Sequence, residues 1–131
     1  METVCVDTEI LWQYLLNKKE AVEMMQQVQK TADLAVTVLS VFELYVLALH
    51  SEKPLENKAV VDALIKRLTV IPFEVGSAAA AAKVQEELTK QKKKSELRDL
   101  WEGMLVSENK CLLLTANPEH YKDIPGVKIY K

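Results

Sequence analysis

The sequence contains few of the residues that build common cofactor-binding and zinc-binding motifs. Only three of its 131 residues are glycines, which excludes a Walker A phosphate loop and a G-x-G-x-x-G dinucleotide loop. The two histidines and two cysteines are too few for a zinc finger, and no H-E-x-x-H motif occurs. A metal centre in this protein would therefore have to use oxygen-bearing side chains.

Long apolar segments are also missing. No uninterrupted apolar run approaches the ~18 residues that a membrane span needs. The first residues lack the cationic start and apolar stretch of a signal peptide. Cys5 and Cys111 both lie inside apolar runs, which is typical of buried thiols in a reducing compartment. Together these features predict a cytoplasmic protein.

The composition is that of one globular domain. Hydrophobic residues make up 49% of the chain and charged residues 27%, which is enough apolar material for a core and argues against disorder. No linker or internal repeat is visible, so residues 1–131 are interpreted as a single domain. The formal net charge of −2 argues against a basic protein that wraps duplex nucleic acid.

Short apolar runs alternate with helical patterns along the whole chain. The runs predict strands at 3–6, 34–38, 70–73, 111–114 and 127–130, and the patterns between them predict helices at 10–16, 21–28, 41–49, 55–68, 76–89 and 96–109. Pro72 cannot donate a hydrogen bond to a central strand, so the third strand is expected at a sheet edge. The alternation predicts a three-layer α/β/α fold with a mainly parallel five-stranded sheet.

Polar side chains gather at one edge of this predicted sheet. Asp7, Glu43 and Asn117 each follow a strand, and parallel strands end at the same edge. Asp99 and Glu102 lie near the start of the helix that precedes the fourth strand. Because that helix must run antiparallel to the strand, its start lies at the same edge of the sheet. Several carboxylates at one point repel each other, and Mg²⁺ or Mn²⁺ relieves that repulsion through oxygen ligands.

Each acid also has an ordinary structural explanation. Ser40 and Glu43 have the spacing of a capping box. Asp7 and Asn117 are suitable helix N-caps, and Asp99 would complement a helix dipole. Periodicity alone does not decide between these alternatives and a metal site.

The motifs resemble those of the PIN-domain ribonucleases, and in size the chain is most similar to the VapC-type toxins of toxin–antitoxin pairs. The residues that carry the resemblance are VCVDTEIL at 4–11, TVLSVFELYVL at 37–47, RDLWEGMLVSENKCLLLTANPEHY at 98–121 and IPGVKIY at 124–130. The resemblance implies a sheet order of 3-2-1-4-5. It also implies hydrolysis of RNA with Mg²⁺ or Mn²⁺, a homodimer, and a cognate antitoxin that blocks the site.

The same resemblance implies roles for individual residues. It implies metal-binding and catalytic acids at Asp7, Glu43 and Asp99, with Thr8 and Thr115 as supporting hydroxyls. Asn117 stands at the fourth acidic position. Two residues depart from the family's pattern: Glu102 stands where an apolar residue is usual, and Glu9 stands where Ser or Asn is commoner. The added acid Glu102 is predicted as a further metal ligand or, alternatively, as a solvent-facing side chain.

A basic run precedes Asp99. Residues 90–98 contain five cations and one anion, among them Lys92, Lys93, Lys94 and Arg98. We predict that these four hold RNA phosphates at the rim of the site, although lysines also favour a solvated helix end.

Two other functions remain as alternatives. A degenerate domain of the same fold could bind RNA or protein without cleaving. A phospho-accepting receiver domain would need paired acids after the first strand, which Asp7 lacks.

Overall fold

A five-stranded parallel sheet forms the centre of the molecule. The computed structural model describes residues 1–131. The strands are β1 (Glu2–Val6), β2 (Ala32–Thr37), β3 (Thr69–Ile71), β4 (Leu112–Leu114) and β5 (Lys128–Ile129). Their order is β3-β2-β1-β4-β5, and every neighbouring pair is parallel. This confirms the predicted fold class and strand order.

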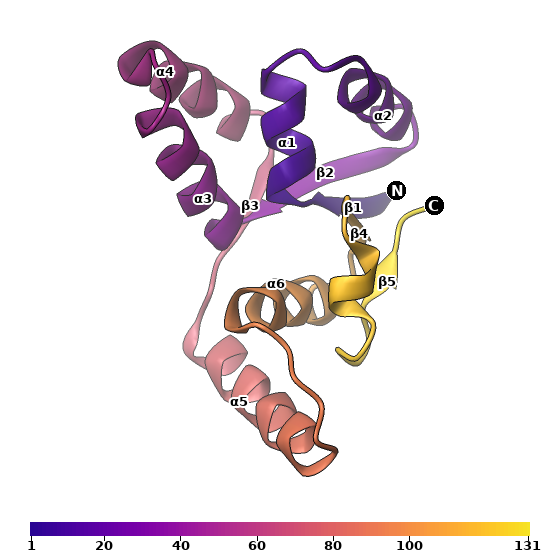
Figure 1. The fold of residues 1–131 in the computed structure, drawn as a ribbon. Coiled ribbons are helices and arrows are strands. Elements are labelled where there is room, and N and C mark those ends of the chain that lie inside the picture. The colour runs from indigo at the N-terminus through magenta and orange to yellow at the C-terminus, as the bar shows by residue number, and fades with distance from the viewer.

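Helices cover both faces of the sheet (Figure 1). One face packs against α1 (Thr8–Leu15), α2 (Lys19–Gln29), α3 (Val38–Leu49) and α4 (Pro54–Ile65), and the other against α5 (Val75–Lys90) and α6 (Leu97–Glu108). Along β1, Val4 and Val6 enter the first core while Cys5 enters the second, because successive strand side chains point to opposite faces. This explains why the strands read as continuous apolar runs.

Some element boundaries differ from the sequence prediction. The third helix begins at Val38 rather than at residue 41 because the Thr37 hydroxyl accepts a hydrogen bond from the Ser40 amide (3.1 Å) and caps it. The fourth helix ends at Ile65, three residues earlier than expected. Strand β3 lies at the sheet edge as predicted, but it ends at Ile71, so Pro72 follows the strand instead of occupying it.

The chain between β4 and β5 carries a 3-10 turn, η1 (Pro118–Tyr121). This turn brings Tyr121 into the second core, on the face of the sheet that α5 and α6 cover. None of the helices combines the length and apolar character needed to cross a bilayer.

Candidate active site

The first acid is fixed where β1 becomes α1. Asp7 is the N-cap of α1, and its Oδ1 accepts a hydrogen bond from the Thr8 amide (2.9 Å). Its own amide donates to the carbonyl of Leu114 on β4 (2.8 Å). The Thr115 hydroxyl, one residue beyond β4, donates to Asp7 Oδ2 (2.8 Å). Asp7 thus caps α1 and also links the end of β1 to the end of β4 by hydrogen bonds. Its side chain is only 8% exposed.

The second acid comes from α3, which leaves β2 at the same sheet edge. Thr8 donates its hydroxyl hydrogen to Glu43 Oε1 (2.6 Å). Since the Ser40 amide bonds to Thr37, Glu43 does not close a capping box, and that structural alternative is wrong. The resemblance implied that the Thr8 hydroxyl supports Asp7, whereas in the structure this hydroxyl donates to Glu43.

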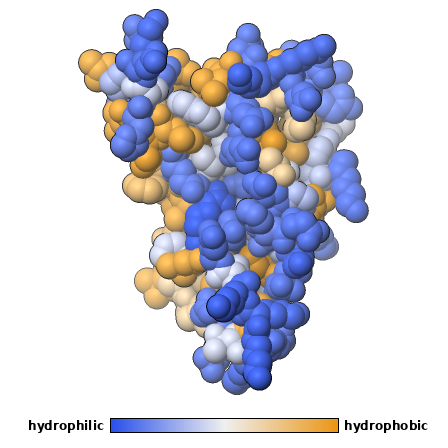
Figure 2. Space-filling view, viewed as in Figure 1, coloured by the Kyte–Doolittle hydropathy of each residue, from blue (hydrophilic) through white to orange (hydrophobic).

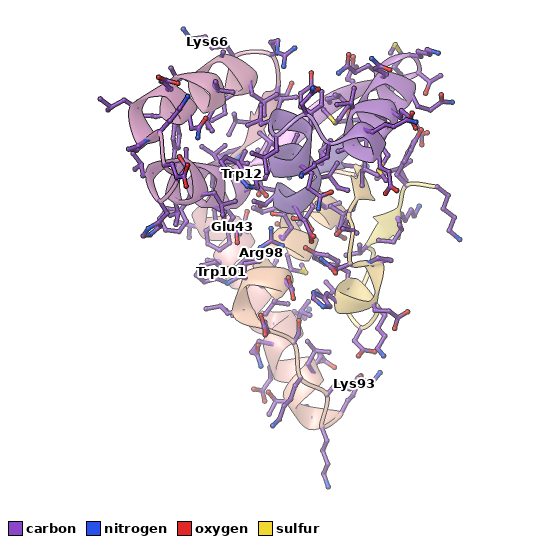
Figure 3. The ribbon with its side chains drawn as sticks, turned by 45° about the horizontal axis from the view of Figure 1, so that its top comes forward. Trp12, Glu43, Lys66, Lys93, Arg98 and Trp101 are labelled. Atoms are coloured by element: carbon purple, nitrogen blue, oxygen red, sulfur yellow. The ribbon has the colours of Figure 1, made fainter.

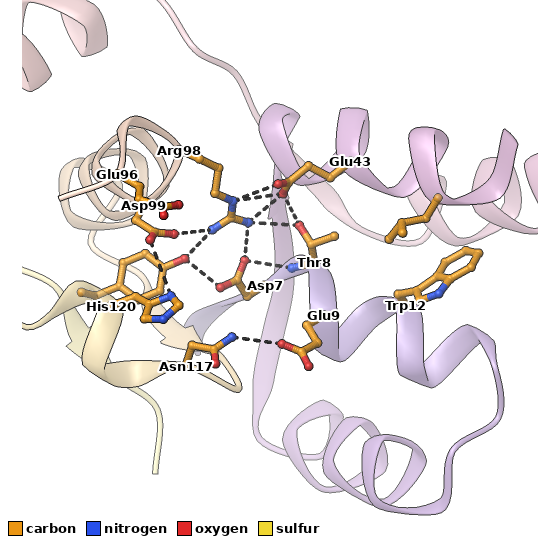
Figure 4. A pocket seen from close by; sticks show the side chains of 12 residues that line it. Asp7, Thr8, Glu9, Trp12, Glu43, Glu96, Arg98, Asp99, Asn117 and His120 are labelled. Carbon is orange, nitrogen blue, oxygen red and sulfur yellow. Dashed lines mark hydrogen bonds and ion pairs between the residues drawn. The ribbon is translucent and has the colours of Figure 1, made fainter. Parts of the chain in front are cut away.

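Arg98 is the central group of the site (Figure 4). Its Nη2 lies 2.6 Å from Asp7 Oδ1 and 2.8 Å from Glu43 Oε1, and its Nη1 lies 3.4 Å from Asp99 Oδ1. Burial lowers the pKa of the guanidinium, but hydrogen bonds to Glu43 and the charge of Asp7 outweigh that effect and raise it. One permanent cation therefore contacts three carboxylates, one from the N-cap of α1 and one each from α3 and α6.

The electrostatic balance at Asp7 follows from this contact. Burial alone would raise the pKa of Asp7, but the charge of Arg98 and hydrogen bonds from Arg98, Tyr121 and Thr115 outweigh it, so the pKa lies below its ordinary value. Asp7 is therefore an anion throughout the neutral range.

Asp99 and Glu102 have different surroundings although they share α6. Asp99 lines the pocket and lies 3.6 Å from His120 Nδ1. Its pKa is raised, mainly by burial, with Arg98 opposing. Glu102 is fully buried behind the pocket, where its Oε1 accepts a hydrogen bond from Thr37 (2.5 Å). Burial, assisted by the charge of Asp7, raises the pKa of Glu102 to about 7.

Tyr121 is a site residue to which the sequence reasoning gave no role. Its hydroxyl donates to Asp7 Oδ2 (2.8 Å), and Arg98 Nη1 approaches the same oxygen of Tyr121 (2.5 Å). Burial and the charge of Asp7 raise the pKa of Tyr121, so it stays a hydrogen-bond donor. Its place in the HY pair that ends the third motif was the available signal.

Asn117 and Glu9 form a pair on the pocket wall opposite α3. The Asn117 amide group donates to Glu9 Oε2 (3.0 Å), and the Asn117 backbone amide donates to Thr115 (3.1 Å). Both side chains line the same cavity as Asp7, Glu43 and Asp99. The structure therefore brings together four of the predicted polar positions, while Glu102 lies behind them.

The basic run divides into two parts. Arg98 points into the acidic site, whereas Lys92, Lys93 and Lys94 lie in the loop between α5 and α6, as Figure 3 shows for Lys93. Lys93 forms an ion pair with Asp123 (3.4 Å). Lys94 lines a small adjoining hollow together with Asp99 and His120. Of the three lysines, Lys94 thus comes nearest to the predicted rim position.

The pocket is a cavity of about 400 Å³ with twelve lining residues, nine of them not hydrophobic. Carboxylate oxygens are the donors that Mg²⁺ or Mn²⁺ prefers, so the chemistry of Asp7, Glu43 and Asp99, which all line this pocket, fits such an ion. Their present spacing is that of guanidinium ligands, and no three acidic, histidine or cysteine side chains converge on a single metal-sized point.

Comparisons with known proteins agree with the fold. Residues 4–125 match the sequence model of a family described as PIN domain. The chain is 31% identical over 104 residues to Ribonuclease VapC2 of Haemophilus influenzae, a match that covers 79% of this chain and 70% of that protein.

Solved structures show the same architecture. The chain superimposes on one from VapBC2 of Rickettsia felis bound to a promoter DNA fragment with a TM-score of 0.85 and 19% identity, covering 98% of this chain and 97% of the other. DNA-bound VapBC of Salmonella typhimurium gives a TM-score of 0.85 at 22% identity, with 99% and 98% covered. At these identities the likeness concerns the fold.

Proposed function

The chain belongs to the PIN domain family, and on this basis we propose that it is a ribonuclease that hydrolyses RNA phosphodiester bonds with Mg²⁺ or Mn²⁺. We further propose that it is the toxin of a toxin–antitoxin pair, since the curated relatives it matches are named VapC ribonucleases. The observation that carries the enzymatic part is the convergence of Asp7, Glu43 and Asp99 on one positive centre.

In this proposal the acids hold the cation and orient water. Asp7, Glu43 and Asp99 supply carboxylate oxygens, with Asn117 at the fourth position on the opposite wall. When bound, a divalent cation lowers the pKa of a coordinated water and stabilises the charge that develops during phosphodiester cleavage. The role of Glu102 as a further metal ligand stays a prediction. In the structure Glu102 accepts a hydrogen bond from Thr37 and does not line the cavity.

The hydroxyl groups around the acids fix their orientation. Thr115 and Tyr121 both donate to Asp7 Oδ2, which leaves its Oδ1 directed toward Arg98. Thr8 holds Glu43 in the same way. Because such hydrogen bonds restrain a carboxylate before any ligand arrives, they limit how far Asp7 and Glu43 must move to hold a cation.

Basic residues near the acidic centre would offset its repulsion of RNA. We propose Lys92, Lys93 and Lys94 as phosphate contacts, with Lys94 nearest to Asp99. Arg98 was predicted as a fourth contact, but its guanidinium is engaged by carboxylates.

Apolar side chains gather on the outer surface of α3 and α4, the orange region at the upper left of Figure 2. Phe42 is 67% exposed, Leu49 53% and Leu55 80%. Exposed apolar patches of this kind mark protein–protein contacts, which supports the proposed homodimer and antitoxin.

A second candidate function is supported by Arg98. A domain whose Asp7 and Glu43 are already paired with its own arginine could bind RNA or a protein without cleaving. Cleavage and binding assays on the same sample separate this alternative from the ribonuclease.

We expect the purified chain to cleave RNA only when a divalent cation is present. RNA fragments should accumulate with Mn²⁺ or Mg²⁺, stop in EDTA and resume when Mn²⁺ is restored in excess, because the acids alone cannot activate water. An Asp99→Asn preparation made in parallel controls for contaminating nucleases. Cleavage that persists in EDTA contradicts the proposed mechanism, and RNA binding without cleavage favours the non-catalytic alternative.

A further inference from the structure

We propose that Arg98 is a built-in counter-cation that competes with a divalent cation for Asp7 and Glu43, so that the ion enters only when the Arg98 side chain swings out of the pocket. This inference rests on the cation site of the proposed function. It adds that the chain regulates access to that site with a residue of its own.

The contacts of Arg98 define the competition. Its Nη2 lies within hydrogen-bond distance of Asp7 Oδ1 (2.6 Å) and Glu43 Oε1 (2.8 Å), and its Nε contacts both Glu43 oxygens (3.1 Å each). These are the oxygens of the two acids that a metal ion would need. Asp7 Oδ1 also accepts a hydrogen bond from the Thr8 amide, and Glu43 Oε1 accepts one from the Thr8 hydroxyl, so with Arg98 in place the lone pairs of both oxygens are already used. A metal ion can therefore bind these two oxygens only in place of Arg98.

The shape of the guanidinium sets the spacing of the acids. It is a planar fork whose donors point outward in several directions, so the acids that surround it are held apart. A Mg²⁺ ion instead requires oxygens at about 2 Å from one point. The carboxylates do not converge in this way while Arg98 lies between them. Cation loading therefore requires both the departure of Arg98 and a small inward movement of the acids.

The position of Arg98 allows it to leave without unfolding the helix. It lies in the first turn of α6, and its side chain is 27% exposed. Figure 4 shows this side chain among the residues that line the cavity. A cation in the first turn opposes the helix dipole, so the helix itself does not favour this placement. The carboxylates are what hold the side chain inward, and a stronger cation can replace it there.

The acidic centre still attracts a cation while Arg98 is in place. Asp7, Glu43 and Asp99 together bring three carboxylates against the single guanidinium. His120 is the other basic group in the pocket, 3.6 Å from Asp99. A divalent ion can therefore approach Asp99 at the open side before Arg98 is displaced.

The test measures Mn²⁺ binding directly, by titration calorimetry and by the paramagnetic resonance signal of free Mn²⁺. Arg98→Gln removes the competing charge and keeps a polar side chain. We expect it to bind Mn²⁺ on the order of tenfold more tightly than the wild type, since the ion no longer breaks charge-assisted hydrogen bonds. The matched control is Arg67→Gln, which removes the other arginine, an exposed residue away from the site, and should leave the affinity unchanged.

Thermal unfolding provides a second readout. In EDTA, Arg98→Gln should unfold at a lower temperature than the wild type, because its buried acids have lost their counter-charge. Saturating Mn²⁺ should raise its unfolding temperature by more than it raises that of the wild type. If Arg98→Gln does not fold in EDTA, refolding on addition of Mn²⁺ supports the proposal, and failure to refold overturns it.

Arg98→Lys separates charge from shape. Lysine keeps the positive charge but, as a single ammonium, cannot occupy the guanidinium contacts simultaneously, so its Mn²⁺ affinity should lie between those of the wild type and Arg98→Gln. Equal Mn²⁺ affinity in the wild type and a folded Arg98→Gln, with cation-dependent RNA cleavage retained, overturns this inference alone. Absence of Mn²⁺ binding in all variants overturns the proposed cation site as well.

Discussion

Substitution of Asp7 by asparagine is expected to lower the rate of RNA cleavage by about a hundredfold or more while the protein remains folded. The size of the effect follows from the several kcal/mol of charge stabilisation that a metal ion provides in the transition state, since each ~1.4 kcal/mol corresponds to a factor of ten. Asparagine has nearly the same shape as aspartate, but a neutral amide binds a hard cation more weakly.

The structural cost of this substitution should be limited. Asp7 accepts hydrogen bonds from Thr8, Thr115 and Tyr121, and an asparagine oxygen can keep part of that set. Arg98 loses one carboxylate but retains Glu43 and Asp99. The loss of one charged hydrogen-bond partner should therefore cost about 1–3 kcal/mol, which leaves a cooperative unfolding transition.

The measurement combines a cleavage time course in Mn²⁺ with circular dichroism and thermal unfolding. Asp33→Asn is the matched control, because Asp33 lies exposed on β2, away from the pocket. Wild-type rates in Asp7→Asn contradict the assignment of Asp7. If Asp7→Asn does not fold, Asp7 is needed for folding. RNA cleavage by the Asp99→Asn variant then tests whether the acids of this site are needed for catalysis.

Substitution of Glu102 by glutamine is expected to stabilise the protein at pH 8 by up to about 3 kcal/mol in EDTA. The pKa of Glu102 is raised from 4.5 to about 7 in the folded state. Between these values the folded protein binds more protons than the unfolded chain, so wild-type stability falls as pH rises. The difference of about 2.5 pKa units corresponds to about 3 kcal/mol once Glu102 is ionised.

Glutamine removes this dependence without changing the shape of the side chain. Its oxygen can accept from Thr37 as Glu102 Oε1 does, and its amide cannot ionise. Denaturant unfolding of both proteins at several pH values should give equal stabilities at about pH 4, below the ordinary glutamate pKa, and a growing advantage for the variant toward pH 8. Glu108→Gln, an exposed site on the same helix, is the control. If Glu102→Gln is less stable than the wild type at pH 8, the claim that ionised Glu102 destabilises the folded protein is wrong.

Much of the fold could be predicted from the sequence because burial on both faces leaves a clear pattern. Runs such as 111–114 carry apolar side chains in both directions, and the alternation with helices then fixes a parallel sheet. The exact ends of helices were less predictable. The third helix begins at Val38 because of a single hydroxyl at Thr37, and a short polar cap gives a weak signal among many threonines and serines.

The candidate site was predicted at the level of position but not of contact. Strand ends and helix direction were enough to place Asp7, Glu43, Asp99 and Asn117 around one cavity. The same reasoning assigned Arg98 to the substrate and gave Tyr121 no role. Spacing along the chain does not reveal which way a long side chain turns, and the inward course of Arg98 depends on three carboxylates brought together only by the folded sheet.

The central claim is that the carboxylates of Asp7, Glu43 and Asp99, from three separate segments of the chain, share one divalent cation. The most direct measurement is anomalous X-ray scattering from crystals grown with Mn²⁺. The account predicts one strong Mn²⁺ peak at about 2 Å from oxygens of Asp7, Glu43 and Asp99, with the Arg98 side chain rotated out of the pocket. Crystals at saturating Mn²⁺ in which Arg98 still contacts Asp7 and no peak lies among the three acids would contradict it.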